Sequence, residues 1–198
     1  MLYIVRHGQT ARNKANVLLG RTDVPLNELG LQQAGITARH FQVAGIVFDR
    51  VYSSPLVRAL DTARIIAPYA EIRIDDRLIE MDYGEYEGCD LNAPPAEVLA
   101  FFRDFVHVPA PDGMEQLPAV TARLGTFLEE ICKDAEQKNI LLATHAISMK
   151  GALEYLTPDS AGRYWSMYIG NCDVWCAEVK DGHYAVPKAW LQSRSPSF

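Results

Sequence analysis

The chain begins with a short apolar run that stops abruptly at a glycine. Residues 2–5 are Leu-Tyr-Ile-Val, and Arg6, His7 and Gly8 follow at once. A run of this length that ends at glycine is typical of a buried strand that stops at a turn. Open α/β sheets bind their ligands beyond the carboxyl ends of their strands. The pattern therefore predicts that His7 lies at the ligand-binding edge of a sheet.

Strand and helix patterns alternate along the chain. Apolar runs predict strands at residues 2–6, 50–53, 71–74, 139–144, 172–180 and 183–189. Helical spacing and end signals predict helices at residues 27–43, 56–69, 95–106, 117–137 and 147–156. This alternation predicts a mostly parallel sheet between layers of helices. The turn signal Asp181-Gly182 adds an antiparallel hairpin, and we expect residues 192–198 to form a loose tail.

The residues around Gly8 carry the side chains of an anion site with a nucleophile. A neutral imidazole such as that of His7 can carry a phosphoryl group, and the Arg6 guanidinium offers a fork of N–H donors that matches phosphate oxygens. Gly8 allows the backbone to approach a ligand closely, because it has no Cβ. Thr10 and Asn13 add short hydrogen-bonding side chains nearby. This segment therefore predicts a phosphate-binding site.

The composition is that of one compact domain spanning residues 1–198. The chain has 198 residues, of which 48% are hydrophobic, so it can bury one sizeable core. A net charge of -6 argues against a nucleic-acid partner, because a phosphate backbone needs a basic face. No apolar run approaches the length that spans a bilayer, and a cleaved presequence would remove His7. We therefore expect a cytoplasmic protein with no membrane partner, whose partner is a small phosphorylated substrate.

Residues 6–13, Arg-His-Gly-Gln-Thr-Ala-Arg-Asn, resemble the signature of the histidine phosphatase superfamily, which also contains the cofactor-dependent phosphoglycerate mutases. Further segments are similar to segments of that family in the same order, and they are residues 20–26, 53–59, 80–88 and 144–145. The resemblance implies a three-layer α/β/α sandwich with a mostly parallel central sheet and the active site at the carboxyl ends of its strands.

The resemblance also implies roles for residues that lie far apart in the sequence. His7 attacks phosphorus and becomes phosphohistidine, while Glu80 protonates the leaving alcohol and later activates water. Arg6 and Arg58 bind the phosphate through their guanidinium forks, and His145, when protonated, would add positive charge beside the equatorial oxygens. We expect no metal and no cofactor in this mechanism.

Three further residues complete the predicted substrate site. Asn13 is predicted to donate to the phosphate, and Thr10 to form a hydrogen bond within the loop. Arg21 is predicted to reach the remainder of the substrate, with a solvated surface position as the alternative.

The segment after Glu80 favours a phosphatase over a mutase. By the resemblance, mutases tend to carry Arg-His after the catalytic glutamate and a long insertion before a later Gly-Glu-Ser segment, but this chain has Met81-Asp82 and reaches Glu115 quickly. Asp82 adds negative charge where a bisphosphorylated intermediate needs cations. A short chain also offers less material to shield phosphohistidine from water. A phosphoglycerate mutase stays the alternative reaction.

Two alternatives from other classes remain open. In a metal hydrolase, His7, His145 and Glu80 would be ligands, although Arg6 and Arg58 would repel a cation and attract an anion. A catalytically inactive binding module is disfavoured because the nucleophile, both arginines, the second histidine and the acid are all present.

The substrate is predicted only as a class. Met81, Tyr83, Tyr86 and Cys89 predict an apolar rim, which suits an ester with a bulky organic group such as an α-ribazole phosphate; a sugar phosphate is the alternative. Departures from the family pattern include Ala146 and Gln116, and they also include Lys150, which stands where an arginine often follows the second histidine. These departures affect the shape of the pocket more than the mechanism, and the sequence makes no prediction about the oligomeric state.

Overall fold

The computed structural model describes residues 1–192, so the tail predicted for residues 192–198 lies almost entirely outside the described part. The centre is a six-stranded sheet with the order β3-β2-β4-β1-β5-β8. Its strands are β1 (Leu2–Arg6), β2 (Arg50–Ser53), β3 (Ile72–Ile74), β4 (Ile140–Thr144), β5 (Val174–Ala177) and β8 (Lys188–Leu191). The short strands β6 (Val179–Lys180) and β7 (His183–Tyr184) pair in a separate hairpin.

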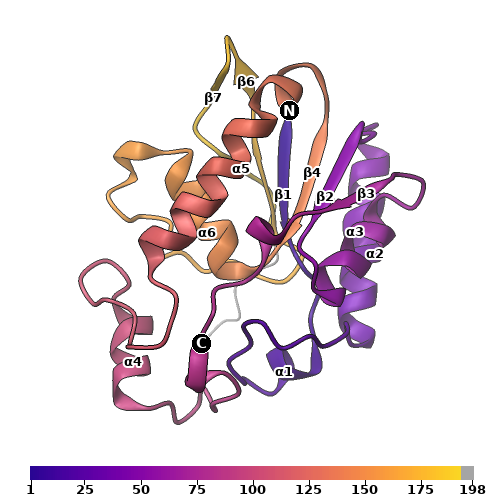
Figure 1. Ribbon diagram of the computed structural model, residues 1–198. Coiled ribbons are helices and arrows are strands. Elements are labelled where there is room, and N and C mark those ends of the chain that lie inside the picture. The colour runs from indigo at the N-terminus through magenta and orange to yellow at the C-terminus, as the bar shows by residue number, and fades with distance from the viewer. Residues whose placement is uncertain (193–198) are drawn as a thin grey trace.

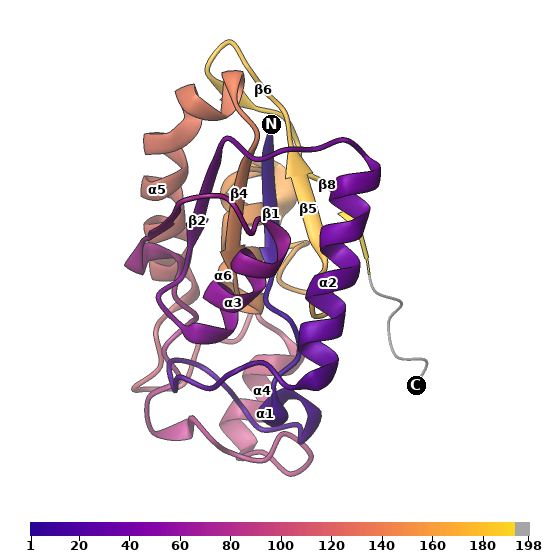
Figure 2. The same ribbon diagram turned by 90° about the vertical axis from the view of Figure 1, so that its right-hand side faces the viewer.

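Helices cover both faces of this sheet, as Figures 1 and 2 show. The helices are α1 (Ala11–Lys14), α2 (Glu28–Val43), α3 (Val57–Ile66), α4 (Ala96–Arg103), α5 (Leu117–Gln137) and α6 (Ala146–Tyr155). Single 3₁₀ turns are η1 (Asp76–Leu78), η2 (Gly84–Tyr86) and η3 (Pro158–Ser160). α2 and α3 lie on one face, and α5 and α6 lie on the other. The predicted α/β/α sandwich is therefore confirmed.

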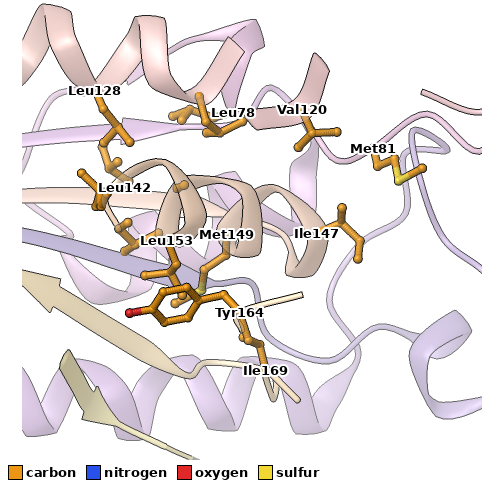
Figure 3. Close-up of a cluster of buried hydrophobic side chains, with 14 of the residues drawn as sticks. Leu78, Met81, Val120, Leu128, Leu142, Ile147, Met149, Leu153, Tyr164 and Ile169 are labelled. Atoms are coloured by element: carbon orange, nitrogen blue, oxygen red, sulfur yellow. The ribbon is translucent and has the colours of Figure 1, made fainter. Parts of the chain in front are cut away.

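Alternating side chains of each strand build a hydrophobic core on each side of the sheet. Leu2 and Ile4 of β1 belong to the core with α5 and α6, whereas Tyr3 and Val5 belong to the core with α2 and α3. Figure 3 shows part of the first core, with Leu142 of β4 close to the helices that cover it. Burial on both faces explains why residues 2–5 of β1 are all apolar, as is usual for parallel strands covered by helices.

The sheet is mostly parallel, as predicted. β1, β2, β3 and β4 run in the same direction, while β5 is antiparallel to both of its neighbours, β1 and β8. The carboxyl ends of β1 and β4 point toward α1 and α4, which lie together at the lower end of the molecule in Figure 1. Any ligand site at those strand ends therefore lies at the same end of the molecule as the loops that carry α1 and α4.

The predicted element boundaries hold for β1, β2 and α5. The helix predicted at residues 95–106 ends earlier, at Arg103, and other differences follow from proline or backbone strain. The helix predicted to reach residue 69 ends at Ile66, because Pro68 disfavours helical geometry at Ala67. The strand predicted at residues 183–189 is split, since Pro187 has no N–H to donate to a ladder. The strand predicted from residue 172 starts later, because Cys172 has a positive φ of 60°.

The predicted hairpin is present between β6 and β7. Asp181 and Gly182 both have positive φ angles, 53° and 74°, as a tight two-residue hairpin turn requires. Within residues 1–192, no helix combines the length and the apolar character needed to cross a membrane.

Candidate active site

The pairing of β1 with β4 places the two predicted histidines side by side. Arg6 pairs with Thr144 in the parallel ladder, so His7 and His145 are the next residues on neighbouring strands. The His7 backbone N–H also donates to the Thr144 carbonyl at 2.9 Å. As a result the two imidazole rings lie with their centroids 5.1 Å apart.

The ring of His7 is held in one tautomer by its own loop. Its Nδ1 lies 2.6 Å from the Gly8 carbonyl oxygen, and a carbonyl oxygen can only accept. Nδ1 therefore carries the proton, which leaves the lone pair of Nε2 available for attack. Burial holds the pKa of His7 well below its ordinary value, and the charges of Arg58 and Arg6 lower it further. The imidazole is neutral at pH 7, as a nucleophile must be.

His145 is fixed from both sides of its ring. Arg58 Nε donates to Nδ1 at 3.2 Å, so the proton is on Nε2, which donates to Ser54 Oγ at 2.7 Å. Burial, followed by the charge of Arg58, holds the pKa of His145 well below its ordinary value. The protonated His145 considered from the sequence is therefore not the form in this structure. Ser54 was not predicted as a site residue, although the segment Ser53-Ser54-Pro55 marked this strand end.

Arg58 is a fully buried cation in the first turn of α3. Beyond its bond to His145, it donates to the Gly20 carbonyl at 2.6 Å and to the Thr22 carbonyl at 3.0 Å. Burial lowers the pKa of Arg58 to about 10, so the guanidinium stays charged at pH 7. A guanidinium has N–H donors beyond those used in these bonds, and they remain for a phosphate.

Arg6 brings a second cation to the end of β1. Its Nη1 donates to the Ile169 carbonyl at 2.5 Å. Within residues 1–192, its buried Nε has no hydrogen-bond partner. A buried N–H without a partner is costly, and an anion bound beside it would supply the missing acceptor.

The loop between β1 and α1 is stabilised by a reciprocal cap. Asn13 N–H donates to Thr10 Oγ1, and Thr10 N–H donates to Asn13 Oδ1, each at 3.1 Å. Thr10 is fully buried, so the structure gives it a local bonding role. Asn13 lines the cavity described below, and its Oδ1 is used as an acceptor, which leaves its amide N–H groups as donors.

Gly8 is required for a different reason than the one expected from the sequence. A Cβ at this position would lie 2.5 Å from the Gly30 carbonyl oxygen at the start of α2. The close approach is therefore between two backbone segments rather than between backbone and ligand. Gly8 N–H also donates to Thr62 Oγ1 at 3.0 Å, which ties the loop to α3.

Glu80 is bound by the amino-terminal end of α6. Its carboxylate accepts from the backbone N–H groups of Met81 at 2.9 Å, Ser148 at 3.1 Å and Ile147 at 3.3 Å. The last two are in the first turn of the helix, whose unpaired N–H groups favour a negative charge. Glu80 is almost fully buried and lines the same cavity as His7. The helix therefore positions a carboxyl group in the cavity that His7 also lines.

Arg21 lies in an ion-pair network next to the cavity and is not among the residues that line it. Its guanidinium contacts Asp82 at 3.0 Å and Glu115 at 3.3 Å, and its Nε donates to the Glu80 carbonyl at 3.4 Å. Arg123 binds the other oxygen of Glu115 at 2.8 Å. These contacts join the loop around Arg21 to the segment that follows Glu80, and the role of Arg21 in substrate binding stays a prediction.

A cavity of about 480 Å³ opens at the strand ends between α1, α4 and α6. Arg6, His7, Asn13 and Glu80 line it, whereas His145 and Arg58 are fully buried and are not among its lining residues. The predicted site residues thus divide into those that face the cavity and those that support it from behind.

The apolar wall of the cavity comes mainly from segments that sequence reasoning did not single out. Its large apolar side chains are Val17, Leu18, Leu19, Tyr83, Leu91, Phe102, Phe105, Trp165, Met167, Tyr168 and Ile169. Of the rim predicted from the sequence, Tyr83 lines the cavity, whereas Met81 is fully buried in the hydrophobic core. Apolar residues of α4 and of residues 165–169 carry no local signal that distinguishes a binding wall from a core. Within residues 1–192, no group of three or more His, Cys, Asp or Glu side chains is placed to hold a metal ion.

The chain matches a family of phosphatases and mutases over nearly its whole length. A model of the histidine phosphatase superfamily (branch 1) matches residues 2–190, and the chain belongs to this family. It is therefore a phosphatase or a mutase.

Relatives of both reaction types are similar to the chain. Phosphoserine phosphatase 1 of Hydrogenobacter thermophilus is 29% identical over 175 residues, which cover 86% of this chain and 82% of that protein. The 2,3-bisphosphoglycerate-dependent phosphoglycerate mutase of Parvibaculum lavamentivorans is 31% identical over 207 residues, covering 98% of this chain and 97% of the mutase. The structure of phosphoserine phosphatase from Entamoeba histolytica in complex with 3-phosphoglyceric acid superposes with a TM-score of 0.81 at 27% identity, covering 98% of this chain and 97% of that one.

Proposed function

We propose that the chain is a phosphomonoester hydrolase that forms a phosphohistidine on His7 and passes the phosphoryl group to water. The observation that carries the proposal is the state of His7: a neutral imidazole with Nδ1 bound to the Gly8 carbonyl and Nε2 unprotonated, in the same cavity as Arg6 and Glu80. A free imidazole nitrogen beside a cation and a carboxyl group is the set of groups that nucleophilic phosphoryl transfer needs.

In the first step, Nε2 of His7 attacks phosphorus, and the bond between phosphorus and the ester oxygen breaks. Arg6 and Asn13, which line the cavity, bind the phosphoryl oxygens and replace part of the hydration of the dianion, while the charge of Arg58 behind the cavity adds to the positive potential there. Glu80, in its acid form, donates its proton to the departing alkoxide, so the alcohol leaves neutral. The products of this step are the alcohol, the phosphohistidine and a Glu80 carboxylate.

In the second step, the Glu80 carboxylate takes a proton from a water molecule as that water attacks the phosphohistidine. The P–N bond breaks, inorganic phosphate leaves and Nε2 of His7 regains its lone pair. Glu80 is protonated again, which closes the cycle. No metal ion is needed in either step.

We infer that the substrate is a small phosphorylated metabolite with an organic group larger than a methyl or ethyl chain. A cavity of about 480 Å³ with a wall of aromatic side chains supports this inference, because such a wall gains free energy by covering apolar surface. An α-ribazole phosphate and a sugar phosphate are the candidates that the sequence favoured, and the phosphoserine phosphatases among the relatives add amino acid phosphates.

Phosphoglycerate mutase activity is the second candidate, and the similarity to the Parvibaculum lavamentivorans mutase over nearly the whole chain favours it. Asp82 weighs against it. In this structure Asp82 forms an ion pair with Arg21. The segment Met81-Asp82 therefore provides no free cation for a bisphosphorylated intermediate.

One experiment tests both reactions. The purified protein is assayed for phosphate release from a panel of metabolite esters and, in parallel, for interconversion of 3- and 2-phosphoglycerate. We expect phosphate release without a divalent cation and its loss in His7→Gln, while His183→Gln, on the exposed side of β7, retains it. Mutase turnover with negligible ester hydrolysis would overturn the proposed phosphatase.

A further inference from the structure

The cavity is lined by a buried cation that the proposed mechanism does not use. Lys150 lies on α6 with 8% of its surface exposed, and it lines the same cavity as Arg6, His7 and Glu80. Its Nζ donates to the Trp165 carbonyl at 2.8 Å and lies 4.8 Å from the centre of the Phe105 ring. Within residues 1–192, this ammonium forms no ion pair.

A buried ammonium without a counter-charge is unfavourable, because its hydration has been replaced only in part. Burial lowers the pKa of Lys150 to about 8, with Arg6 lowering it further and Glu80 raising it. Lys150 is therefore still mostly protonated at pH 7. One carbonyl and one aromatic ring satisfy part of its bonding capacity, and its remaining N–H donors can serve an anion.

Lys150 and Glu80 are held by the same stretch of helix. Glu80 accepts from the N–H groups of Ile147 and Ser148, and Lys150 follows within the next turn of α6. Ala146, Ile147 and Lys150 all line the cavity. An ester whose phosphoryl group is at His7 and whose leaving oxygen is at Glu80 thus has its organic part in the space that Lys150, Phe105 and Trp165 line.

We infer that Lys150 determines specificity by binding a carboxylate on the alcohol portion of the substrate, so that the substrate class is phosphate monoesters of hydroxy acids. This inference rests on the proposed hydrolase function. A single ammonium suits a carboxylate better than a second phosphate, since a phosphate dianion needs more than one cation or oriented donor. The aromatic neighbours of Lys150 exclude water and strengthen the ion pair that the carboxylate would form.

The test compares esters that differ only in the carboxylate. O-phosphoserine is paired with O-phosphoethanolamine, and 4-carboxyphenyl phosphate is paired with phenyl phosphate. The two pairs differ in the distance between phosphorus and the carboxylate. For each pair, the ratio of kcat/KM for the carboxylated ester to kcat/KM for its partner is measured. We expect a ratio well above one for the wild-type protein in at least one pair.

In Lys150→Met, which keeps the length of the side chain without its charge, we expect that ratio to fall about 10- to 100-fold, mainly through KM. Lys150→Arg, which keeps the charge, is expected to restore much of the ratio. Arg103→Gln is the matched control, because Arg103 lines the same cavity at an exposed position of α4. Thermal unfolding of each variant identifies any that fails to fold. If Lys150→Met does not fold, the ratio for Lys150→Arg is compared with that of the wild-type protein instead.

The outcomes separate the two proposals. A wild-type ratio near one in both pairs, or a ratio that falls in Arg103→Gln and not in Lys150→Met, overturns the role of Lys150 and leaves the hydrolase intact. Absence of hydrolysis of all four esters and of 4-nitrophenyl phosphate overturns the proposed function itself.

Discussion

Arg58 Nε donates a hydrogen bond to Nδ1 of His145 at 3.2 Å, so a buried cation sets the tautomer of a buried imidazole. The two residues come from α3 and from the end of β4, and they are joined behind the cavity rather than within its lining. Burial is the main reason that His145 stays neutral, and this contact adds to it, because a protonated Nδ1 would face the guanidinium without a lone pair to accept its N–H. The pair is therefore preorganised, and we expect it to support the proposed phosphate site.

Removing this support is expected to affect both stability and phosphate binding. Arg58→Met leaves the Gly20 and Thr22 carbonyls without their donors, and we expect a loss of about 2–4 kcal/mol in the free energy of unfolding. Inhibition by inorganic phosphate should weaken at the same time. Urea denaturation and inhibition assays measure the two effects. Arg64→Met on the same helix is the control, because Arg64 is exposed and bonds Asp61 at the surface, so unchanged values are expected.

Glu80 is expected to matter most when the leaving group is poor. In Glu80→Gln the proton donor is lost, and we expect kcat for an alkyl phosphate to fall by about 10²–10⁴. The fall should be much smaller for 4-nitrophenyl phosphate, whose leaving group needs no proton. Steady-state kinetics with both esters give the comparison, and Glu85→Gln, exposed in the same acidic stretch, is the control. An equal loss on both esters would contradict proton donation by Glu80.

Because both histidines are buried, we expect the free energy of unfolding to decrease in mild acid. Burial lowers the pKa values of His7 and His145 in the folded state below that of an unfolded chain, which is about 6.5. Below pH 6.5 the unfolded state binds protons that the folded state does not, so the free energy of unfolding decreases as the pH is lowered. Each histidine can contribute up to about 1.4 kcal/mol per pH unit. Urea titrations at pH 7, 6 and 5 should show this slope, and His145→Gln should reduce it; a flat profile would show that the histidines titrate normally.

Glycine at position 8 is expected to be irreplaceable. A Cβ would lie 2.5 Å from the Gly30 carbonyl oxygen, and both atoms belong to constrained backbone segments. We expect Gly8→Ala to destabilise the protein by about 1–3 kcal/mol and to displace the ring of His7, lowering kcat. In Gly35→Ala, within α2, nothing lies within 4 Å of the new Cβ, so a gain of about 0.5–1 kcal/mol is expected. Equal effects of the two changes in chemical denaturation would refute the steric argument.

The preference for carboxylated esters should depend on pH through Lys150. Its pKa of about 8 is low for a lysine, so the ammonium loses its proton as the pH rises through 8. The charged groups that act on it are Arg6 of β1 and Glu80, while Phe105, which follows α4, presents its aromatic ring and Trp165 its carbonyl. The ratio of kcat/KM values for a carboxylated ester and its partner should therefore fall above pH 8. Lys150→Arg should keep the ratio constant to higher pH; an identical fall in that variant would assign the titration to another group.

Much of the fold follows from local patterns. The apolar run before Arg6, the long amphipathic helix at residues 117–137 and the Asp181-Gly182 turn each predict an element that is present. Those signals are strong because each element restricts the residue types that it allows. β1 is buried on both faces, the long helix needs one apolar face, and the turn needs positive φ angles. Boundaries were less predictable where a proline after the helix or between strands ended the element early.

The candidate site residues could be named from the sequence. An arginine beside a histidine at a strand end indicates an anion site, and the glutamate and the second histidine lie in segments that resemble those of the family. What only the tertiary structure decided is which of them face the cavity, which tautomer each histidine adopts and that Lys150 is buried there with no ion pair to any of residues 1–192. Those properties depend on the parallel register that pairs Arg6 with Thr144 and on α6, whose first turn binds Glu80. Such contacts join segments far apart in the chain, so no local pattern specifies them, and burial then sets the charge of each group.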